Sequence, residues 1–263
     1  WVLEHRVGTV ETAVLTFDAY RGVLGLDHTG EWAVTGTTAS GTSTASASTT
    51  VGGVTTTVSF SNFSNSTTTV SNFATSGTGG ILNDIGAFSH TVQNTASVGM
   101  QFNWDTTPEY ATDLAATDAG TARMTITFSQ AVKDPIIHLD RIGGAGGIQN
   151  GMQLTLVDDG VSLTRLAGTS HFRVSGNVID NSQAGVANSV GSGFGAESST
   201  ETTGGTSAGS VRINGTVTSV TFLMATSANA NATEGLGGDG FELKLTLDAP
   251  PDAKGDTFTV NED

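Results

Sequence analysis

Residues 229–240 (NANATEGLGGDG) combine the side chains and the spacing best suited to binding a metal ion. Four oxygen-bearing side chains fall within this short stretch: Asn229, Asn231, Glu234 and Asp239. The glycines around Asp239 let the backbone turn sharply and offer carbonyl oxygens as further ligands. Ca²⁺ takes about 6–8 oxygen ligands, so the pattern predicts a calcium site in which Gly238 and Asp239 also contact a bound ligand. The alternative is an ordinary glycine-rich hairpin loop whose acids face solvent.

A second candidate lies where a predicted strand, 136–142, meets the glycine-rich run 143–147. Asp140 is a candidate metal ligand and also a candidate ligand-binding residue. Arg141 could hold a carboxylate through two parallel hydrogen bonds, and it is notable in a chain with only 10 Lys and Arg residues. The alternative is an internal Asp140–Arg141 pair that braces the loop. His138 is expected to be a buried or half-buried strand residue and not a metal ligand.

Residues 103–118 (NWDTTPEYATDLAATD) form a third candidate, because acids and aromatic rings share one predicted loop. Its acids are Asp105, Glu109, Asp113 and Asp118, and its aromatic residues are Trp104 and Tyr110. Such a loop suits either Ca²⁺, through Asp105, Asp113 and Asp118, or stacking of a ligand on Trp104 and Tyr110. The alternative is a solvated loop. Asn83 with Asp84, and Asp27 with His28 and Glu31, are weaker clusters of the same kind.

Motifs for catalysis are much weaker, and we expect the protein not to be an enzyme. Residues 205–209 (GTSAG) match the Gly-x-Ser-x-Gly pattern, but that motif needs a strand before it and a helix after it. Cysteine is absent, which excludes disulfides, thiol nucleophiles and cysteine-based zinc sites. A glycosidase with paired carboxylates stays open, because the separation of two carboxylates is a three-dimensional property.

The net charge of −15 limits the classes of molecule that the protein is expected to bind. Nucleic acid and anionic lipid both favour cationic surfaces, so neither is expected to bind. No apolar run approaches the ~18 residues of a membrane-spanning helix, so membrane insertion is not expected. The acidic surface either serves solubility or gathers carboxylates around Ca²⁺.

Short runs of alternating polar and apolar residues, bounded by Gly, Asn or Asp, predict an all-β fold. The predicted strands are 10–17, 54–60, 124–128, 136–142, 152–157, 211–217, 220–224 and 241–247. They indicate a β-sandwich of the jelly-roll or lectin-like kind, with long Ca²⁺-binding loops. The Asp-Gly pair at 159–160 predicts a hairpin turn, and the Thr/Ser-rich tract 35–57 predicts an exposed β ribbon. Residues 175–210 are expected to form a long loop that is either functional or disordered.

Residues 250–263 (PPDAKGDTFTVNED) resemble the start of the cadherin-like and immunoglobulin-like repeats of giant bacterial surface adhesins. The ordered set 125–144, 164–172, 214–222 and 237–245 resembles the ligand-binding module of large repeats-in-toxin adhesins. This resemblance spans about residues 55–248 and implies a Ca²⁺-dependent β-sandwich that captures short peptides by their free C-terminal carboxylate. The string Asp-Gly-Phe at 239–241 is also similar to the metal-site strand of legume-type lectins.

The resemblance implies two parts: a ligand-binding domain over 1–249, and a linker with the start of the next repeat over 250–263. It implies a monomeric module on the bacterial cell surface that serves adhesion and biofilm formation, with neighbouring domains of the same fibre as further partners. Two alternatives remain: a Ca²⁺-dependent lectin that binds glycans, and a spacer without a ligand.

Overall fold

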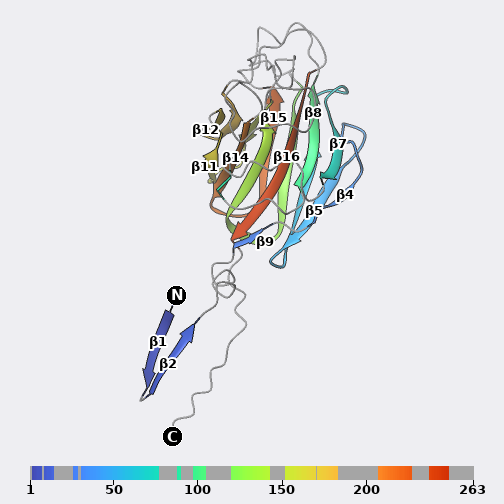
Figure 1. Ribbon diagram of the computed structural model, residues 1–263. Helices are drawn as coiled ribbons and strands as arrows, with labels where there is room; N and C mark the ends of the chain where they lie inside the picture. Colours follow the sequence, from blue (N-terminus) through green and yellow to red (C-terminus); the bar gives the residue numbers. More distant parts are fainter. Residues whose placement is uncertain are drawn as a thin grey trace.

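A computed structural model describes residues 2–7, 9–14, 26–28, 31–76, 88–89, 97–104, 120–142, 152–169, 171–182, 207–226 and 237–248 (Figure 1). Every regular element in these stretches is a β-strand, so the predicted all-β class is confirmed. Strands β1 (Val2–Val7) and β2 (Thr9–Val14) pair only with each other, as an antiparallel hairpin.

The other strands form the main body. They are β3 (Leu26–His28), β4 (Ala33–Thr35), β5 (Ser46–Val51), β6 (Val54–Ser61), β7 (Thr69–Ser76), β8 (Ser97–Trp104), β9 (Ala122–Ile142), β10 (Met152–Leu156), β11 (Ser162–Gly168), β12 (Phe172–Ser175), β13 (Val178–Asn181), β14 (Ser207–Asn214), β15 (Thr216–Thr226) and β16 (Gly237–Asp248). All of their pairings are antiparallel.

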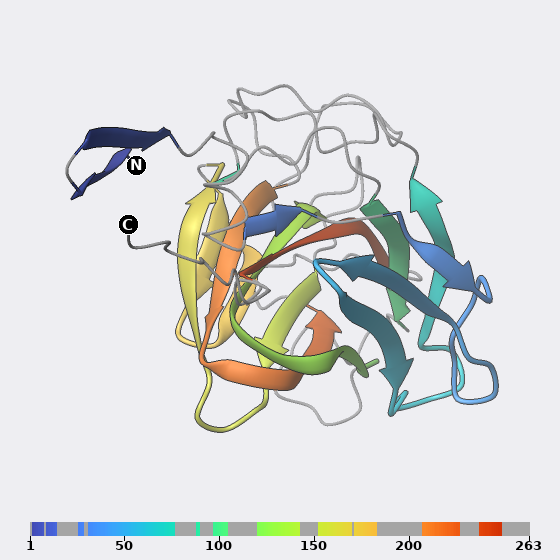
Figure 2. The same ribbon diagram turned by 90° about the horizontal axis from the view of Figure 1, so that it is seen from below.

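Strand β9 is shared by two sheets, which makes the body a β-sandwich. Its first half pairs with β6 and β15, and this first sheet has the order β4-β5-β6-β9-β15-β10-β13-β12. Its second half pairs with β14 and β16, and this second sheet has the order β11-β14-β9-β16-β8-β7, with β3 beside the end of β16. Figure 2 shows these strands from below, arranged around one interior.

One hydrophobic core fills the space between the sheets. The first half of β9 alternates, with Met124, Ile126 and Phe128 buried in the core. The second half contributes Ile137 and Leu139 to the same core, opposite Leu245 and Leu243 of β16. Period-two alternation therefore places the predicted apolar residues of β9 and β16 inside, as expected for strands with one face toward a core.

Several strands end together at one end of the sandwich, which we name the loop end. The strand termini that border it are Trp104, Ile142, Met152, Asn181, Ser207, Thr226 and Gly237. Strand register joins Gly237 to Trp104, Ile142 to Ser207, and Met152 to Thr226. A hydrogen bond from Asn181 Nδ2 to the Ile142 carbonyl oxygen, 3.1 Å long, links the first sheet to the second there.

The structure changes four of the predicted elements. The Asp159-Gly160 turn exists, but β10 and β11 belong to different sheets and do not form a hairpin. The predicted strand 211–217 is divided at Gly215, where β14 ends and β15 begins. The tract 35–57 is a ribbon, as expected, but Ala45, Ala47 and Val51 bury one of its faces in the core. The ends of the predicted loop 175–210 form β13 and part of β14, and residues 183–206 lie outside the described residues.

Candidate functional site

The loop end joins four segments that contain no Lys or Arg: residues 105–119, 143–151, 183–206 and 227–236; of these, 143–151 also contains no acid. Their carboxylate side chains are Asp105, Glu109, Asp113, Asp118, Glu197, Glu201 and Glu234. The three candidate segments of the sequence are thus attached to the same end of the sandwich. These segments thus contain seven carboxylates and no basic residue.

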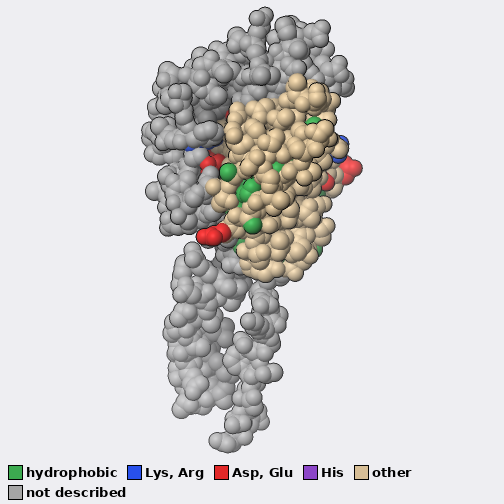
Figure 3. Space-filling view, turned by 90° about the vertical axis from the view of Figure 1, so that its right-hand side faces the viewer, with side chains coloured by type: hydrophobic (Ala, Val, Ile, Leu, Met, Phe, Trp, Pro, Cys, Tyr) green, Lys and Arg blue, Asp and Glu red, His purple; other side chains and the backbone are tan. Residues whose placement is uncertain are grey.

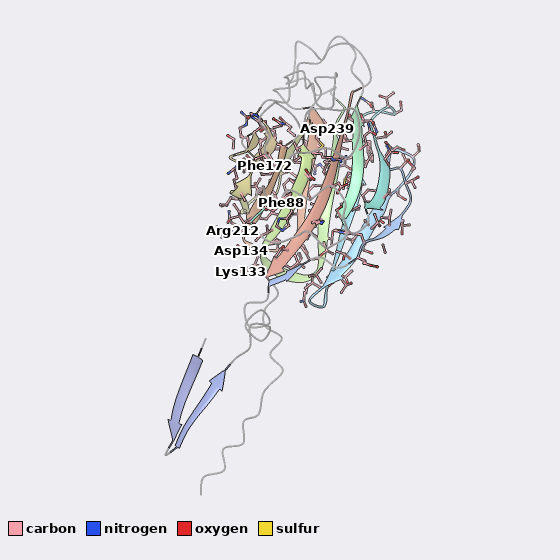
Figure 4. The ribbon with its side chains drawn as sticks, in the orientation of Figure 1. Phe88, Lys133, Asp134, Phe172, Arg212 and Asp239 are labelled. Atoms are coloured by element: carbon pink, nitrogen blue, oxygen red, sulfur yellow. The ribbon has the colours of Figure 1, made fainter. Side chains whose placement is uncertain are left out.

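Asp239 is the candidate residue whose geometry is best defined. It lies at the start of β16, opposite Phe102 of β8, and its side chain is buried. Its Oδ2 accepts a hydrogen bond of 2.9 Å from the backbone N–H of Met152, the first residue of β10. Figure 4 shows Asp239 near the loop end, far from Lys133 and Asp134 at the opposite end. Asp239 therefore joins the two sheets where the acidic segments attach.

Asp140 and Arg141 lie beside a β-bulge in β9. The pairing with β14 shifts between Ser207, which is opposite Ile142, and Gly209, which is opposite Leu139, so β9 contains one extra residue here. Arg141 has a φ of 66°, a left-handed conformation that is uncommon for a residue other than glycine. Because of this extra residue, Ile142 follows Leu139 in the core. Arg141, which strict alternation would place on the same face as Leu139, is not part of the core. Both Asp140 and Arg141 are buried.

The face of β9 and β16 that points away from the core carries four ionisable residues, which we name the polar block: His138, Asp140, Glu242 and Lys244. His138 lies directly opposite Lys244, and Asp140 directly opposite Glu242, so all four side chains share one face. Their side chains are between 0% and 3% exposed. The second half of β9 is therefore buried on both faces, one apolar and one polar.

Hydrogen bonds and an aromatic ring enclose the polar block. The Nδ1 and Nε2 atoms of His138 each lie 2.8 Å from a hydroxyl oxygen, of Ser210 and Thr246 respectively. Phe88 packs edge-on against the His138 ring, with a centroid distance of 5.9 Å. The Ser97 hydroxyl of β8 donates to Glu242 Oε2 over 2.6 Å. His138 is thus a buried strand histidine, as predicted, with both ring nitrogens engaged.

Lys244 has an unusual environment for a lysine. Burial lowers its pKa to about 8, although the nearby carboxylates of Glu242 and Asp140 act in the opposite direction. Loss of water around an ammonium group disfavours the charged form, and here this effect exceeds the attraction of the two acids. Burial therefore favours the neutral amine of Lys244 more than it would be favoured on the protein surface.

The polar block was missed by the sequence reasoning. The string 241–247 (FELKLTL) alternates apolar and polar residues, which is typical of a strand with one face in water. The second face of this strand is instead covered, in part by Phe88 and by Ser89, whose N–H donates to Ser210 Oγ over 3.0 Å. Polar residues on neighbouring predicted strands, 136–142 and 241–247, were the available signal.

The candidate residues of the sequence fall into three groups. Asp140 and Asp239 lie on opposite faces of the second sheet. Glu242 of β16 is directly opposite Asp140 and shares its face, and Asp239 is an odd number of residues from Glu242 on the same strand, so its side chain points to the other face. Trp104 and Gly238 lie at the loop end, where only their backbones are described. Seven candidates lie outside the described residues: Tyr110, Asn229, Asn231, Glu234, Asp105, Asp113 and Asp118.

Within the described stretches, no three His, Asp or Glu side chains are grouped as metal ligands. Those stretches also contain no helix long and apolar enough to cross a membrane. No protein-family model, no curated protein and no solved structure matches this chain.

Proposed function

We propose that this chain is a Ca²⁺-dependent ligand-binding module of a bacterial surface adhesin, without enzymatic activity. The observation that carries the proposal is the attachment of the acidic segments 105–119, 183–206 and 227–236 to one end of a rigid β-sandwich. The resemblance of residues 125–144 and 237–245 to the binding modules of repeats-in-toxin adhesins supports the same function.

The mechanism follows from the charge of the loop end. Without a cation, the carboxylates of these segments repel one another, because no Lys or Arg lies among them. Bound Ca²⁺ removes this repulsion and orders the segments around shared oxygen ligands. An ion with an open coordination position then accepts oxygens from the ligand. A free peptide carboxylate suits such a position, and this is the ligand class that we propose.

The proposal assigns calcium to the acids of residues 105–118 and 229–239, including Asp239 at the start of β16. Asp140 is left out, because it shares the buried polar block with Lys244. Sandwich strands of fixed register hold the start of each acidic segment in place, so ligand binding requires ordering of the segments alone.

Titration calorimetry with Ca²⁺, followed by peptide titration with and without a chelator, tests the proposal. We expect Ca²⁺ to raise the melting temperature and to be required for binding of peptides with a free C-terminus. A variant with Asp105, Asp113 and Asp118 replaced by Asn should lose Ca²⁺ affinity. Asp159→Asn is the matched control, because this exposed acid lies in the β10–β11 turn.

Two outcomes would contradict the proposal. An unchanged melting temperature and an unchanged peptide affinity after chelation would remove calcium from the function. Ca²⁺-dependent binding on a glycan array, with no binding to free C-terminal peptides, would replace the peptide-binding function with that of a lectin.

A further inference from the structure

The polar block places a lysine amine and an aspartate carboxyl group on the same buried face of neighbouring strands. Lys244 of β16 lies opposite His138, and Asp140 is two residues further along β9, so Lys244 and Asp140 are diagonal neighbours. Diagonal Cβ atoms in an antiparallel pair are about 7 Å apart, a span that a long side chain reaches. Both residues are at most 2% exposed.

Burial favours the reactive form of Lys244. A lysine amine is a nucleophile only when it has lost its proton, and burial lowers the pKa of Lys244 to about 8. Two groups held in reacting geometry have effective concentrations of about 10⁵–10⁸ M, which replaces the improbable encounter of an amine and an acid in water.

Glu242 supplies the third group that such a reaction needs. It lies directly opposite Asp140 on the same face, and its carboxylate acts electrostatically on Lys244. The Ser97 hydroxyl of β8 donates a hydrogen bond to Glu242 Oε2 over 2.6 Å. A carboxylate fixed beside both partners can take the proton from the attacking amine and return it to the departing oxygen.

We propose that Lys244 and Asp140 form an intramolecular amide bond that ties β16 to β9. The bond forms between Nζ of Lys244 and Cγ of Asp140, and a carbon–oxygen bond of Asp140 breaks. An ammonium and a carboxylate thereby become an amide and one water molecule, so atoms and charge balance without any other reactant. Glu242 carries the proton between the two groups.

The structure favours Asp140 over Glu242 as the partner of Lys244. Glu242 lies on the same strand as Lys244 and accepts a hydrogen bond from Ser97 of β8, whereas Asp140 lies on the neighbouring strand β9, diagonal to Lys244. Phe88, packed on His138 beside the block, and the buried environment limit access of water, which would otherwise hydrolyse or prevent the amide. The inference is independent of calcium and of the ligand.

Intact-mass spectrometry of the purified 263-residue chain tests the inference. We expect a mass lower than the sequence mass by one water molecule, both in native and in denaturing solvent. Trypsin should then leave the bond after Lys244 uncut and yield a branched product that joins residues 134–141 to residues 213–254. A wild-type mass equal to the sequence mass, with normal cleavage after Lys244, would overturn the inference.

Variants assign the roles of the three residues. Lys244→Arg keeps the positive charge but cannot form the amide, so it should regain the full sequence mass. Lys133→Arg is the matched control, because Lys133 is exposed and lies on the other half of β9; it should stay one water molecule below its calculated mass. Glu242→Gln should greatly reduce the linked fraction. Fragmentation that places the bond on residue 242 would overturn the assignment to Asp140.

Discussion

Asp134 and Gly215 are joined by two hydrogen bonds at the place where the chain passes twice between the sheets. The N–H of Asp134 donates to the Gly215 carbonyl oxygen over 2.8 Å, and the N–H of Gly215 donates to Asp134 Oδ1 over 2.8 Å. At Asp134, β9 leaves the first sheet for the second; at Gly215, β14 of the second sheet becomes β15 of the first. One residue pair thus fixes both crossings.

We expect Asp134→Ala to lower the free energy of unfolding by about 1–3 kcal/mol, because it leaves the Gly215 N–H without its acceptor. Alanine also fits poorly at the Asp134 φ of 49°. Asp134→Asn keeps a side-chain oxygen and tolerates this φ, so it should cost less than half as much. Urea denaturation of both variants measures the difference. Equal losses would show that the acceptor oxygen is unimportant.

Gly209→Ala should destabilise the protein by about 1–3 kcal/mol through overpacking. A Cβ at position 209 would lie 2.2 Å from Cδ1 of Phe172 and 2.7 Å from the Ala167 carbonyl oxygen. Gly41→Ala is the control, because a Cβ there meets nothing within 4 Å. Thermal unfolding of the two variants checks the prediction. In the background of Phe172→Leu, the added cost of Gly209→Ala should shrink, and an unchanged cost would assign the clash to Ala167.

The pair Arg173–Asp180 should contribute measurable coupling in the β12–β13 hairpin. Arg173 donates from Nε to Asp180 Oδ1 over 2.7 Å and from Nη2 to Oδ2, and this bond raises the pKa of Arg173. Asp180 is buried, whereas Arg173 is 43% exposed. Removal of one partner of a buried pair costs about 3–5 kcal/mol, and solvent at Arg173 reduces this to about 1–3 kcal/mol.

A double-mutant cycle with Arg173→Gln and Asp180→Asn measures this coupling by urea denaturation. We expect the losses in the free energy of unfolding of the two single variants to sum to more than the loss of the double variant. Each single change leaves the other member of the pair without its partner, whereas the double change removes both. Strict additivity of the two losses would show that the hydrogen-bonded pair adds nothing to stability.

The pH dependence of stability should reveal Lys244 when its amine is free. In Asp140→Ala, the proposed amide cannot form, and burial still lowers the Lys244 pKa from 10.5 toward about 8. Between these values the unfolded chain binds a proton that the folded chain has released, so the free energy of unfolding should rise from pH 8 to pH 10.5. The added change Lys244→Met should flatten this rise, and a rise that persists would assign it to another group.

The strands were predictable where packing follows a local pattern. Residues 124–128 and 241–247 alternate so regularly that their core-facing side chains follow from the sequence alone. The division of 211–217 at Gly215 was not predictable, because it depends on Asp134, which is distant in sequence. The Asp159-Gly160 turn was recognised from its residue types, but only long-range pairing decides that β10 and β11 join different sheets.

The candidate site shows the same boundary between local and long-range information. Asp239 was identified from its glycine-rich surroundings, whereas its partner, the Met152 N–H, lies 87 residues away in sequence. Glu242 and Lys244 were interpreted as residues of a half-exposed strand, since nothing in 241–247 shows that Phe88 covers the neighbouring His138. That charged residues on two neighbouring strands form one buried block can be recognised only once the register between the strands is known.

Figure 3 shows one side of the body on which described surface atoms are mostly uncharged. The described part of the chain enters and leaves the sandwich at the end without the acidic segments, where Leu26 of β3 pairs with Asp248 of β16. Tension applied between the chain before Leu26 and the chain after Asp248 would be transmitted mainly through this short contact. The sandwich would then lie beside the line of force, and its loop end would stay mechanically unloaded.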